Sequence, residues 1–79
     1  MINAYILINI RVGKIEPIVK ALQKIEKLDS IAVVAGEYDV VVRLGVEQLE
    51  DLLEITDQIQ MLEGIVKTNT QIIEKEIAV

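Results

Sequence analysis

The chain has 79 residues, with no cysteine and no histidine, and its 13 acidic and 8 basic residues give a net charge of −5. This composition excludes disulfides, zinc–cysteine sites and histidine-dependent catalysis, and the negative charge argues against direct binding of nucleic acid, which requires a basic surface. The longest uncharged run, residues 1–10, has about half the length of a membrane span and lacks the basic region of a signal peptide. We therefore expect a cytoplasmic protein without membrane contact.

Hydrophobic residues make up 52% of the chain, and because phenylalanine and tryptophan are absent, isoleucine, valine, leucine and alanine supply nearly all of them. A domain of this size buries only about 60% of the surface that its unfolded chain exposes. So much aliphatic surface on one small domain favours a further partner for burial. We predict an obligate oligomer.

Two periodic segments open the chain. Residues 5–12 alternate between two faces, one of them carrying isoleucines, which predicts a β-strand that ends at Gly13. Pro17 then stands in what would be the first turn of a helix, where no intrahelical N–H bond is lost. Apolar residues recur at helical spacing to about Lys27. The buried stripe predicted for this helix consists of Ile15, Ile18, Val19, Leu22 and Ile25.

The stretch from residue 31 to residue 44 is the most informative. Two β-branched runs flank Gly36, Glu37, Tyr38 and Asp39, which predicts a β-hairpin. The glycine allows a positive φ and leaves backbone groups uncovered, while Glu37 and Asp39 can accept hydrogen bonds from a ligand ammonium group. Gly36 and Asp39 are also good turn residues, so a purely structural turn is the alternative.

The second half of the chain again contains a helix and a strand. The helix begins with Glu47, Glu50 and Asp51, which suit the positive end of a helix dipole, and it ends at Gly64. We explain these carboxylates by capping, and no metal site is predicted. The stripe predicted for the helix consists of Leu49, Leu52, Leu53, Ile55, Ile59 and Leu62. Residues 65–77 alternate and are rich in β-branched side chains, which predicts a long strand.

Thr68 and Thr70 lie two residues apart on one face of this last strand. Their hydroxyl groups could therefore act together on one ligand oxygen. Threonine is also a good strand residue, so the pair is equally compatible with a structural role.

The element order is strand, helix, strand, strand, helix, strand, and similar triplets at residues 11–13 and 43–45 indicate two related halves. Short right-handed connections favour an α+β, ferredoxin-like βαββαβ fold: a four-stranded antiparallel sheet of order 4-1-3-2 with both helices on one face. Because side chains alternate, Leu7 and some of the valines at 33–34 and 41–42 must point to the uncovered face, which we expect to be apolar. Such a face is best buried against another copy, so a dimer is predicted.

Several blocks of sequence agree with one protein family. Residues 12–14 (Val-Gly-Lys) end the first strand, residues 36–39 match a Gly-x-Tyr-Asp hairpin, and residues 64–70 match a Gly-Val-x-x-Thr-x-Thr pattern at the start of the last strand. With the element order, these blocks resemble, over nearly the whole chain, the ligand-binding module of the Lrp/AsnC (feast/famine) transcription regulators. This module is called RAM, for regulation of amino acid metabolism.

The resemblance implies a dimeric α+β barrel, with dimers that assemble further, commonly into octamers, and bind amino acid effectors between dimers. It implies no cofactor. Carried over by position, the ligand site would consist of Gly36, Glu37, Tyr38, Asp39, Thr68 and Thr70. Full-length members carry a helix-turn-helix domain before this module, and nothing precedes Met1 here, so we expect residues 1–79 to be a stand-alone RAM domain. Such a domain would modulate transcription through full-length Lrp/AsnC regulators.

Other functions are compatible with the same fold. An enzyme of the dimeric α+β barrel class would need a histidine or a dense set of polar groups. The chain offers mainly Tyr5, Asn9, Arg11, Tyr38 and Arg43. A purely structural assembly module is the second alternative, and an ACT-like amino acid domain is the third, although it lacks the Gly-x-Tyr-Asp hairpin. The sequence therefore favours a sensor that is not an enzyme.

Overall fold

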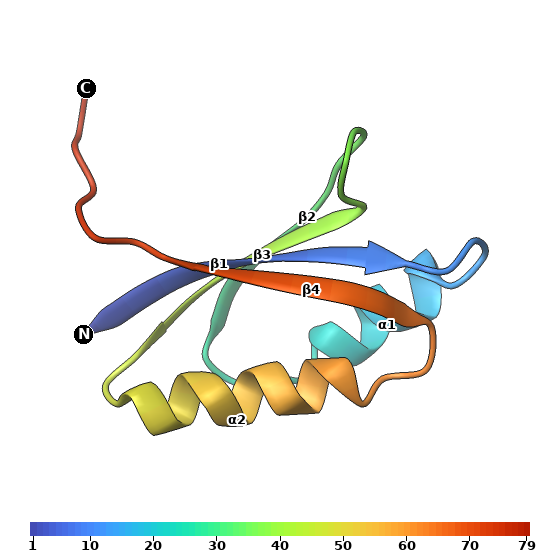
Figure 1. The fold of residues 1–79 in the computed structure, drawn as a ribbon, viewed down its shortest axis with the longest axis horizontal. Coiled ribbons are helices and arrows are strands. Elements are labelled where there is room, and N and C mark those ends of the chain that lie inside the picture. Colours follow the sequence, from blue (N-terminus) through green and yellow to red (C-terminus); the bar gives the residue numbers. More distant parts are fainter.

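A computed structural model describes all 79 residues and contains a four-stranded antiparallel sheet with two α-helices on one side of it (Figure 1). The elements are β1 (Ile2–Ile10), α1 (Ile15–Leu22), β2 (Leu28–Val33), β3 (Val40–Val46), α2 (Leu49–Gln60) and β4 (Ile65–Ile72). The strands are arranged β2-β3-β1-β4, which is the predicted order 4-1-3-2 counted from the other edge. The prediction of a ferredoxin-like α+β fold is confirmed.

The face of the sheet on which the helices lie, called here the covered face, forms the core. Alternate residues of β1 and β3 point to it, and α1 and α2 contribute residues at helical spacing. The buried cluster consists of Ala4, Ile6, Ile8, Ile10, Ile18, Leu22, Val40, Val42, Leu44, Val46, Leu52, Ile55 and Ile59. No polar side chain is buried. The buried core therefore holds the strands in place and contains no polar side chain for chemistry.

Both helices are shorter than predicted. α1 ends at Leu22, and the backbone then turns through Lys27, whose φ of 78° is left-handed. In α2, the prediction that Leu49 and Leu53 belong to the buried stripe is wrong, since they are 48% and 58% exposed. They lie on the flank of the helix, about 90° or more from the centre of its buried stripe at 100° per residue. Neither helix is long and apolar enough to cross a membrane.

The strand boundaries follow pairing rather than composition. Residues 28–30, predicted as a connection, belong to β2, because Leu28 and Ser30 pair with Leu44 and Arg43 of β3. The last strand ends at Ile72 rather than at residue 77, because its pairing with β1 stops at the pair of Ala4 and Ile72.

The other face of the sheet, called here the open face, is mixed rather than apolar. Leu7 and Val41 point to it and lie opposite each other on β1 and β3, as the alternation predicts. Leu7 also lies opposite Asn69 of β4, and the neighbouring pair is Tyr5 with Arg43. The expectation of a purely apolar face is therefore wrong, because this face offers hydrogen-bonding groups beside its aliphatic surface.

The segment after β4 contacts the sheet at two places. The N–H of Ile73 donates a hydrogen bond to the carbonyl oxygen of Asn3 at 2.8 Å. Further along, the guanidinium group of Arg43 pairs with Glu76 at 2.9 Å and with Asp29 of β2 at 2.8 Å. The hydrogen bond with Glu76 is the largest cause that raises the pKa of Arg43, which therefore stays charged at every physiological pH.

Candidate functional site

The loop between β2 and β3, residues 34–39, closes over the end of β1. The N–H of Val34 donates to the carbonyl oxygen of Asp39 at 2.9 Å, which closes the loop, and the N–H of Asp39 donates to that of Ile8 at 2.9 Å, which ties it to β1. In Figure 1 this loop rises from the sheet on the side away from the helices. The hairpin predicted from the sequence is therefore present, with its turn placed over the open face.

The carboxylate of Asp39 has a structural partner. Its Oδ2 accepts a hydrogen bond from the backbone N–H of Ile10 at 2.7 Å. The pairing of β1 with β4 shifts register between Asn9 and Ile10, so the carboxylate binds an N–H at an irregular point of the ladder. The other oxygen, Oδ1, has no hydrogen-bond partner within the chain, which leaves it available to a ligand ammonium group.

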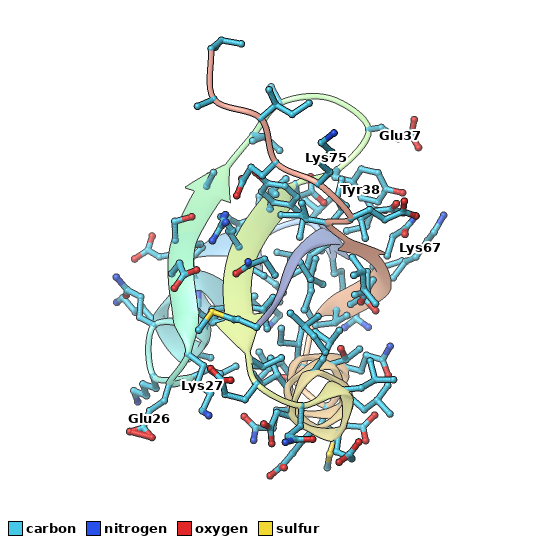
Figure 2. The ribbon with its side chains drawn as sticks, turned by 90° about the vertical axis from the view of Figure 1, so that its left-hand side faces the viewer. Glu26, Lys27, Glu37, Tyr38, Lys67 and Lys75 are labelled. Atoms are coloured by element: carbon cyan, nitrogen blue, oxygen red, sulfur yellow. The ribbon has the colours of Figure 1, made fainter.

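Gly36 and Glu37 form the exposed tip of the loop. Gly36 has a φ of +145°, a conformation that residues with a side chain rarely adopt. The side-chain amide of Asn9 donates to the carbonyl oxygen of Glu37 at 2.8 Å, while the Glu37 carboxylate points outward into solvent (Figure 2). Asn9 is thus a residue that holds the loop and that the sequence did not single out for this role.

Tyr38 is half-buried and contacts β4. Its hydroxyl oxygen accepts a hydrogen bond from the side-chain amide of Asn69 at 3.1 Å, and Asn69 Oδ1 in turn accepts one from Gln71 Nε2 at 2.7 Å. Neither amide was predicted from the sequence to belong to the site. The signal that would have found them is their alternation on β4, which puts them on the open face once the pairing with β1 is known.

Thr68 and Thr70 point to the covered face. They lie opposite buried isoleucines of β1, and the Thr68 hydroxyl oxygen accepts a hydrogen bond from Gln60 of α2 at 2.9 Å. Within one chain, the structure thus brings Gly36, Glu37, Tyr38 and Asp39 together in the loop but separates the two threonines from them by the sheet.

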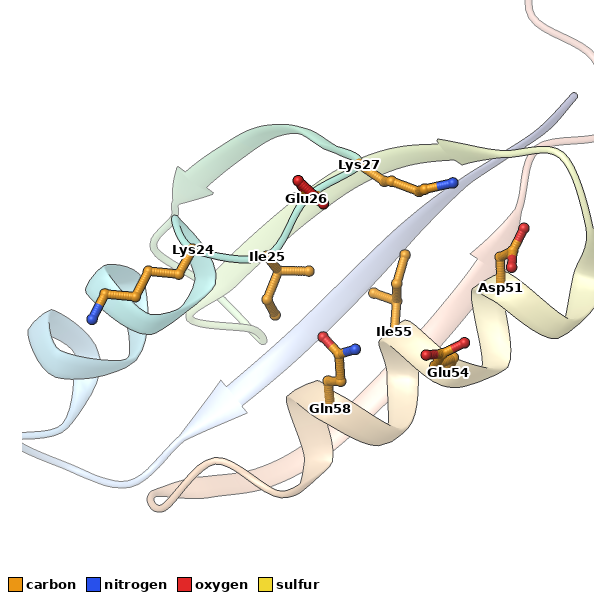
Figure 3. Close-up of a pocket in the computed structure, with 8 residues that line it drawn as sticks. All are labelled: Lys24, Ile25, Glu26, Lys27, Asp51, Glu54, Ile55 and Gln58. Atoms are coloured by element: carbon orange, nitrogen blue, oxygen red, sulfur yellow. The ribbon is translucent and has the colours of Figure 1, made fainter.

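The largest cavity, about 390 Å³, lies on the helix side (Figure 3). Its lining residues are Lys24, Ile25, Glu26, Lys27, Asp51, Glu54, Ile55 and Gln58. None of the predicted site residues lines it, and its charged side chains are mostly exposed and form no ion pair with one another. It is an open, solvated cleft between the α1–β2 connection and α2, so the loop of residues 34–39 remains the better candidate.

The family model described as the Lrp/AsnC ligand binding domain matches residues 3–78. The chain belongs to this family. The prediction of a RAM domain is therefore confirmed over nearly the whole chain.

The relatives of this Lrp/AsnC domain are regulators. The HTH-type transcriptional regulator FL11 of Pyrococcus furiosus is 31% identical over 74 residues, which cover 94% of this chain and 49% of FL11. The FL11 protein of Pyrococcus abyssi is 32% identical over 72 residues, which cover 91% of the chain and 48% of the relative. The chain spans about half the length of the curated relatives it matches. Because family and relatives are transcription regulators, the expectation that the chain is not an enzyme is confirmed.

Solved structures agree with the Lrp/AsnC fold. The protein TTHA0845 from Thermus thermophilus superimposes with a TM-score of 0.92 at 26% identity, and each chain is covered completely. The transcriptional regulator NMB0573 of Neisseria meningitidis, solved as a complex with L-Met, has a TM-score of 0.88 at 20% identity over 99% of this chain and 53% of that one. The second likeness is one of fold alone.

Proposed function

We propose that this Lrp/AsnC domain is an amino acid sensor and assembly module, and that the 34–39 loop of one copy and the threonines of another together form its ligand site. The family match and the L-Met complex of the structurally similar NMB0573 support a small amino acid as the ligand. An α-amino acid needs an acceptor for its ammonium group and donors for its carboxylate. Asp39 Oδ1 and the hydroxyls of Tyr38, Thr68 and Thr70 are groups of these kinds.

One observation carries the proposal that the site is shared. Tyr38 contacts the open face through Asn69, whereas Thr68 points to the covered face and contacts Gln60 of α2. A small ligand lying against one face of the sheet reaches only one of these sets. Both sets can act on one ligand if the loop of one copy approaches the β4 strand of another, which makes assembly a condition for complete binding.

Self-association has a physical basis in the open face. Leu7 and Val41 form an aliphatic centre there, and amide and guanidinium groups surround it, as in interfaces with an apolar core and a polar rim. A homodimer through this face, assembling further into an octamer, is the arrangement that we propose.

The role in transcription would be indirect. A net charge of −5 does not suit phosphate contacts, so we propose that full-length Lrp/AsnC regulators in the cytoplasm are partners and supply the contact with DNA. Co-purification with such a regulator, with and without amino acids, tests this part. Failure to recover a regulator under any amino acid supply would contradict it.

Calorimetric titration with the standard amino acids, combined with measurement of molecular mass, tests the sensor function. We expect saturable binding by at least one amino acid, weakened by Asp39→Ala with assembly retained. If no amino acid binds, a purely structural assembly module is the better description.

A mixing experiment tests whether the site is shared. Tyr38→Phe and the double variant Thr68→Val/Thr70→Val should each bind poorly. If the two variants exchange subunits in an equal mixture, random pairing restores intact sites in about a quarter of the positions. If each site lies within one chain, the mixture regains no binding, and the shared site is wrong.

A further inference from the structure

The sheet ends in two edge strands, β2 and β4, which differ in how well they are protected against pairing with a further strand. β2 has six residues, and its register shifts between Leu28 and Ser30. Short strands and irregular register are features by which natural edges avoid pairing. β4 has eight residues, its pairing with β1 is regular from Thr68 to Ile72, and its single charged residue, Lys67, lies before this regular part. The outer side of β4 is therefore suited to accept another strand.

The bonds between β4 and β1 identify the backbone groups that are free on this outer side. The N–H of Ile73 donates to the carbonyl oxygen of Asn3, so this residue faces β1. Because the direction alternates along a strand, the N–H and C=O groups of Thr68, Thr70 and Ile72 face outward, where the sheet has no further strand. The segment that follows β4 bonds to β1 and β3 and leaves this edge free.

One side of α2 lies along the β4 edge. Gln60 of α2 donates a hydrogen bond to the Thr68 hydroxyl at 2.9 Å. At 100° per residue, Leu49 and Leu53 lie within about 20° of Gln60 around the helix. α2 and β4 run in opposite directions (Figure 1), so Leu53 comes about level with Ile72. Leu49, Leu53 and Ile72 are each about half exposed, which gives the β4 edge an aliphatic surface beside its free backbone groups.

The exposed surface of α2 is also negatively charged. Residues 47–63 contain no basic residue, and none of their carboxylates forms an ion pair within the chain. Glu50 and Asp57 are exposed and lie three residues before and four residues after Leu53, so they are its neighbours on the helix surface. A partner that covers Leu53 therefore meets carboxylates that attract positive charge. The acidic residues of this segment are Glu47, Glu50, Asp51, Glu54, Asp57 and Glu63.

We infer that the β4 edge binds an extended segment of a partner protein, which adds a fifth strand to the sheet by hydrogen bonds with the backbone of β4. In this mode of recognition, main-chain hydrogen bonds supply affinity and alternate side chains supply specificity. On the α2 side of the added strand, the side chains are apolar, to contact Leu53, and basic, to pair with Glu50 and Asp57. A homodimer through the open face leaves this surface free, because α2 lies on the other side of the sheet (Figure 1).

The experiment is titration of the isotope-labelled chain with a capped peptide, Val-Thr-Lys-Thr-Val-Thr-Lys, observed by nuclear magnetic resonance of the backbone amides. In a strand, its valines and lysines share one face and its threonines the other. We expect the amides of Thr68, Thr70 and Ile72 to shift and to exchange more slowly with solvent, because they gain acceptors. The same peptide with glutamate in place of both lysines should bind about tenfold more weakly, since ion pairs are replaced by repulsion.

Two variants test the side-chain contacts, each with a matched control. Leu53→Ser should weaken binding of the lysine peptide about fivefold, as for loss of part of an aliphatic contact. Val33→Ser, on the β2 edge, should leave binding unchanged, although the two side chains are similarly exposed, at 58% and 60%. Glu50→Gln should weaken binding about twofold. Glu26→Gln, which changes an exposed carboxylate on the α1–β2 connection, should have no effect.

The outcomes separate this inference from the proposed function. Shifts confined to β4 and α2 that depend on the lysines of the peptide and on Leu53 support the inference. If the β4 amides do not respond, or if the glutamate peptide binds equally well, it is overturned. If dilution of the chain alone changes the same amides, a second copy occupies the edge, and the inference of a different partner is overturned. Amino acid titration of the same sample reports the sensor function independently.

Discussion

On the covered face of the sheet, the side chains of β1 and β3 form part of a core without a single buried polar group, whereas on the open face the same strands present asparagine, tyrosine and arginine. Side chains alternate between the two faces along each strand, so neighbouring residues have different roles. The covered face determines how the chain folds. The open face leaves the strands' remaining positions free for hydrogen bonding, ligand contacts and association.

The largest effect that separates the faces should come from Ile8→Ala compared with Leu7→Ala. Ile8 is fully buried in the core, so its truncation leaves a cavity and should lower the free energy of unfolding by about 3 kcal/mol. Leu7 is half-buried on the open face and should cost less than about 1.5 kcal/mol in the single chain.

Urea denaturation at several protein concentrations measures both variants. The loss in Ile8→Ala should not depend on concentration, whereas Leu7→Ala should mainly shift the concentration at which the chain associates. Equal losses in both variants, independent of concentration, would show that the two faces do not differ in this way.

The covered face was predictable from the sequence because periodicity reports burial. The alternation of Ile6, Ile8 and Ile10 and the spacing of Leu52, Ile55 and Ile59 are direct consequences of strand and helix geometry. Periodicity gave wrong predictions of burial where a helix carries more apolar residues than its buried stripe can hold. Leu49 and Leu53 are as hydrophobic as their buried neighbours, but about half of each side chain stays exposed.

The site was only partly predictable. The 36–39 turn carries local signals, and the loop is present. The register between strands that are far apart in the sequence determines the roles of Asn9, Asn69 and Gln71. A register shift at Asn9 makes this register harder to infer from the sequence. The separation of Thr68 from Tyr38 also follows from register, since one residue of slip would exchange the two faces.

The next largest effect on stability should come from filling the space beside Gly64, on the helix side of the sheet. Gly64 has a φ of +103°, and an added Cβ would lie 2.8 Å from the Lys14 Cβ. Gly64→Ala should therefore lower the free energy of unfolding by about 2 kcal/mol, from backbone strain and overlap together. Gly13→Ala is the matched control, because its φ of +85° is also positive but nothing lies within 4 Å. It should cost about 1 kcal/mol. Thermal denaturation of both variants gives the comparison, and equal midpoints would exclude a role for overlap.

A smaller effect should appear where the loop meets the open face. Asp39→Ala removes the acceptor of the Ile10 N–H, which is partly buried, and should cost about 1 kcal/mol. Glu37→Ala removes a neighbouring carboxylate without a hydrogen bond and should stay within about 0.5 kcal/mol. Hydrogen exchange at the Ile10 amide is the specific measurement. It should accelerate in Asp39→Ala only, and unchanged exchange there would mean that the carboxylate does not hold the loop.

The smallest effect on stability should come from Glu76→Gln, which removes an exposed ion pair with Arg43. Such pairs contribute little, so the thermal midpoint should fall by no more than about 4 °C. Because the pKa of Arg43 is raised in the folded protein, its contribution to stability is complete below the unfolded-state pKa and is lost only as the pH rises through the folded-state pKa. Arg43 therefore causes no pH dependence of the stability between about pH 5 and pH 9. What should change is the order of residues 74–79, measured as nanosecond motion of their amides by nuclear magnetic resonance. Asp29→Asn, which breaks the other ion pair of Arg43, is the control that should leave those amides unchanged. If both variants mobilise the segment equally, Arg43 holds it through its overall placement on the open face rather than through its bond with Glu76.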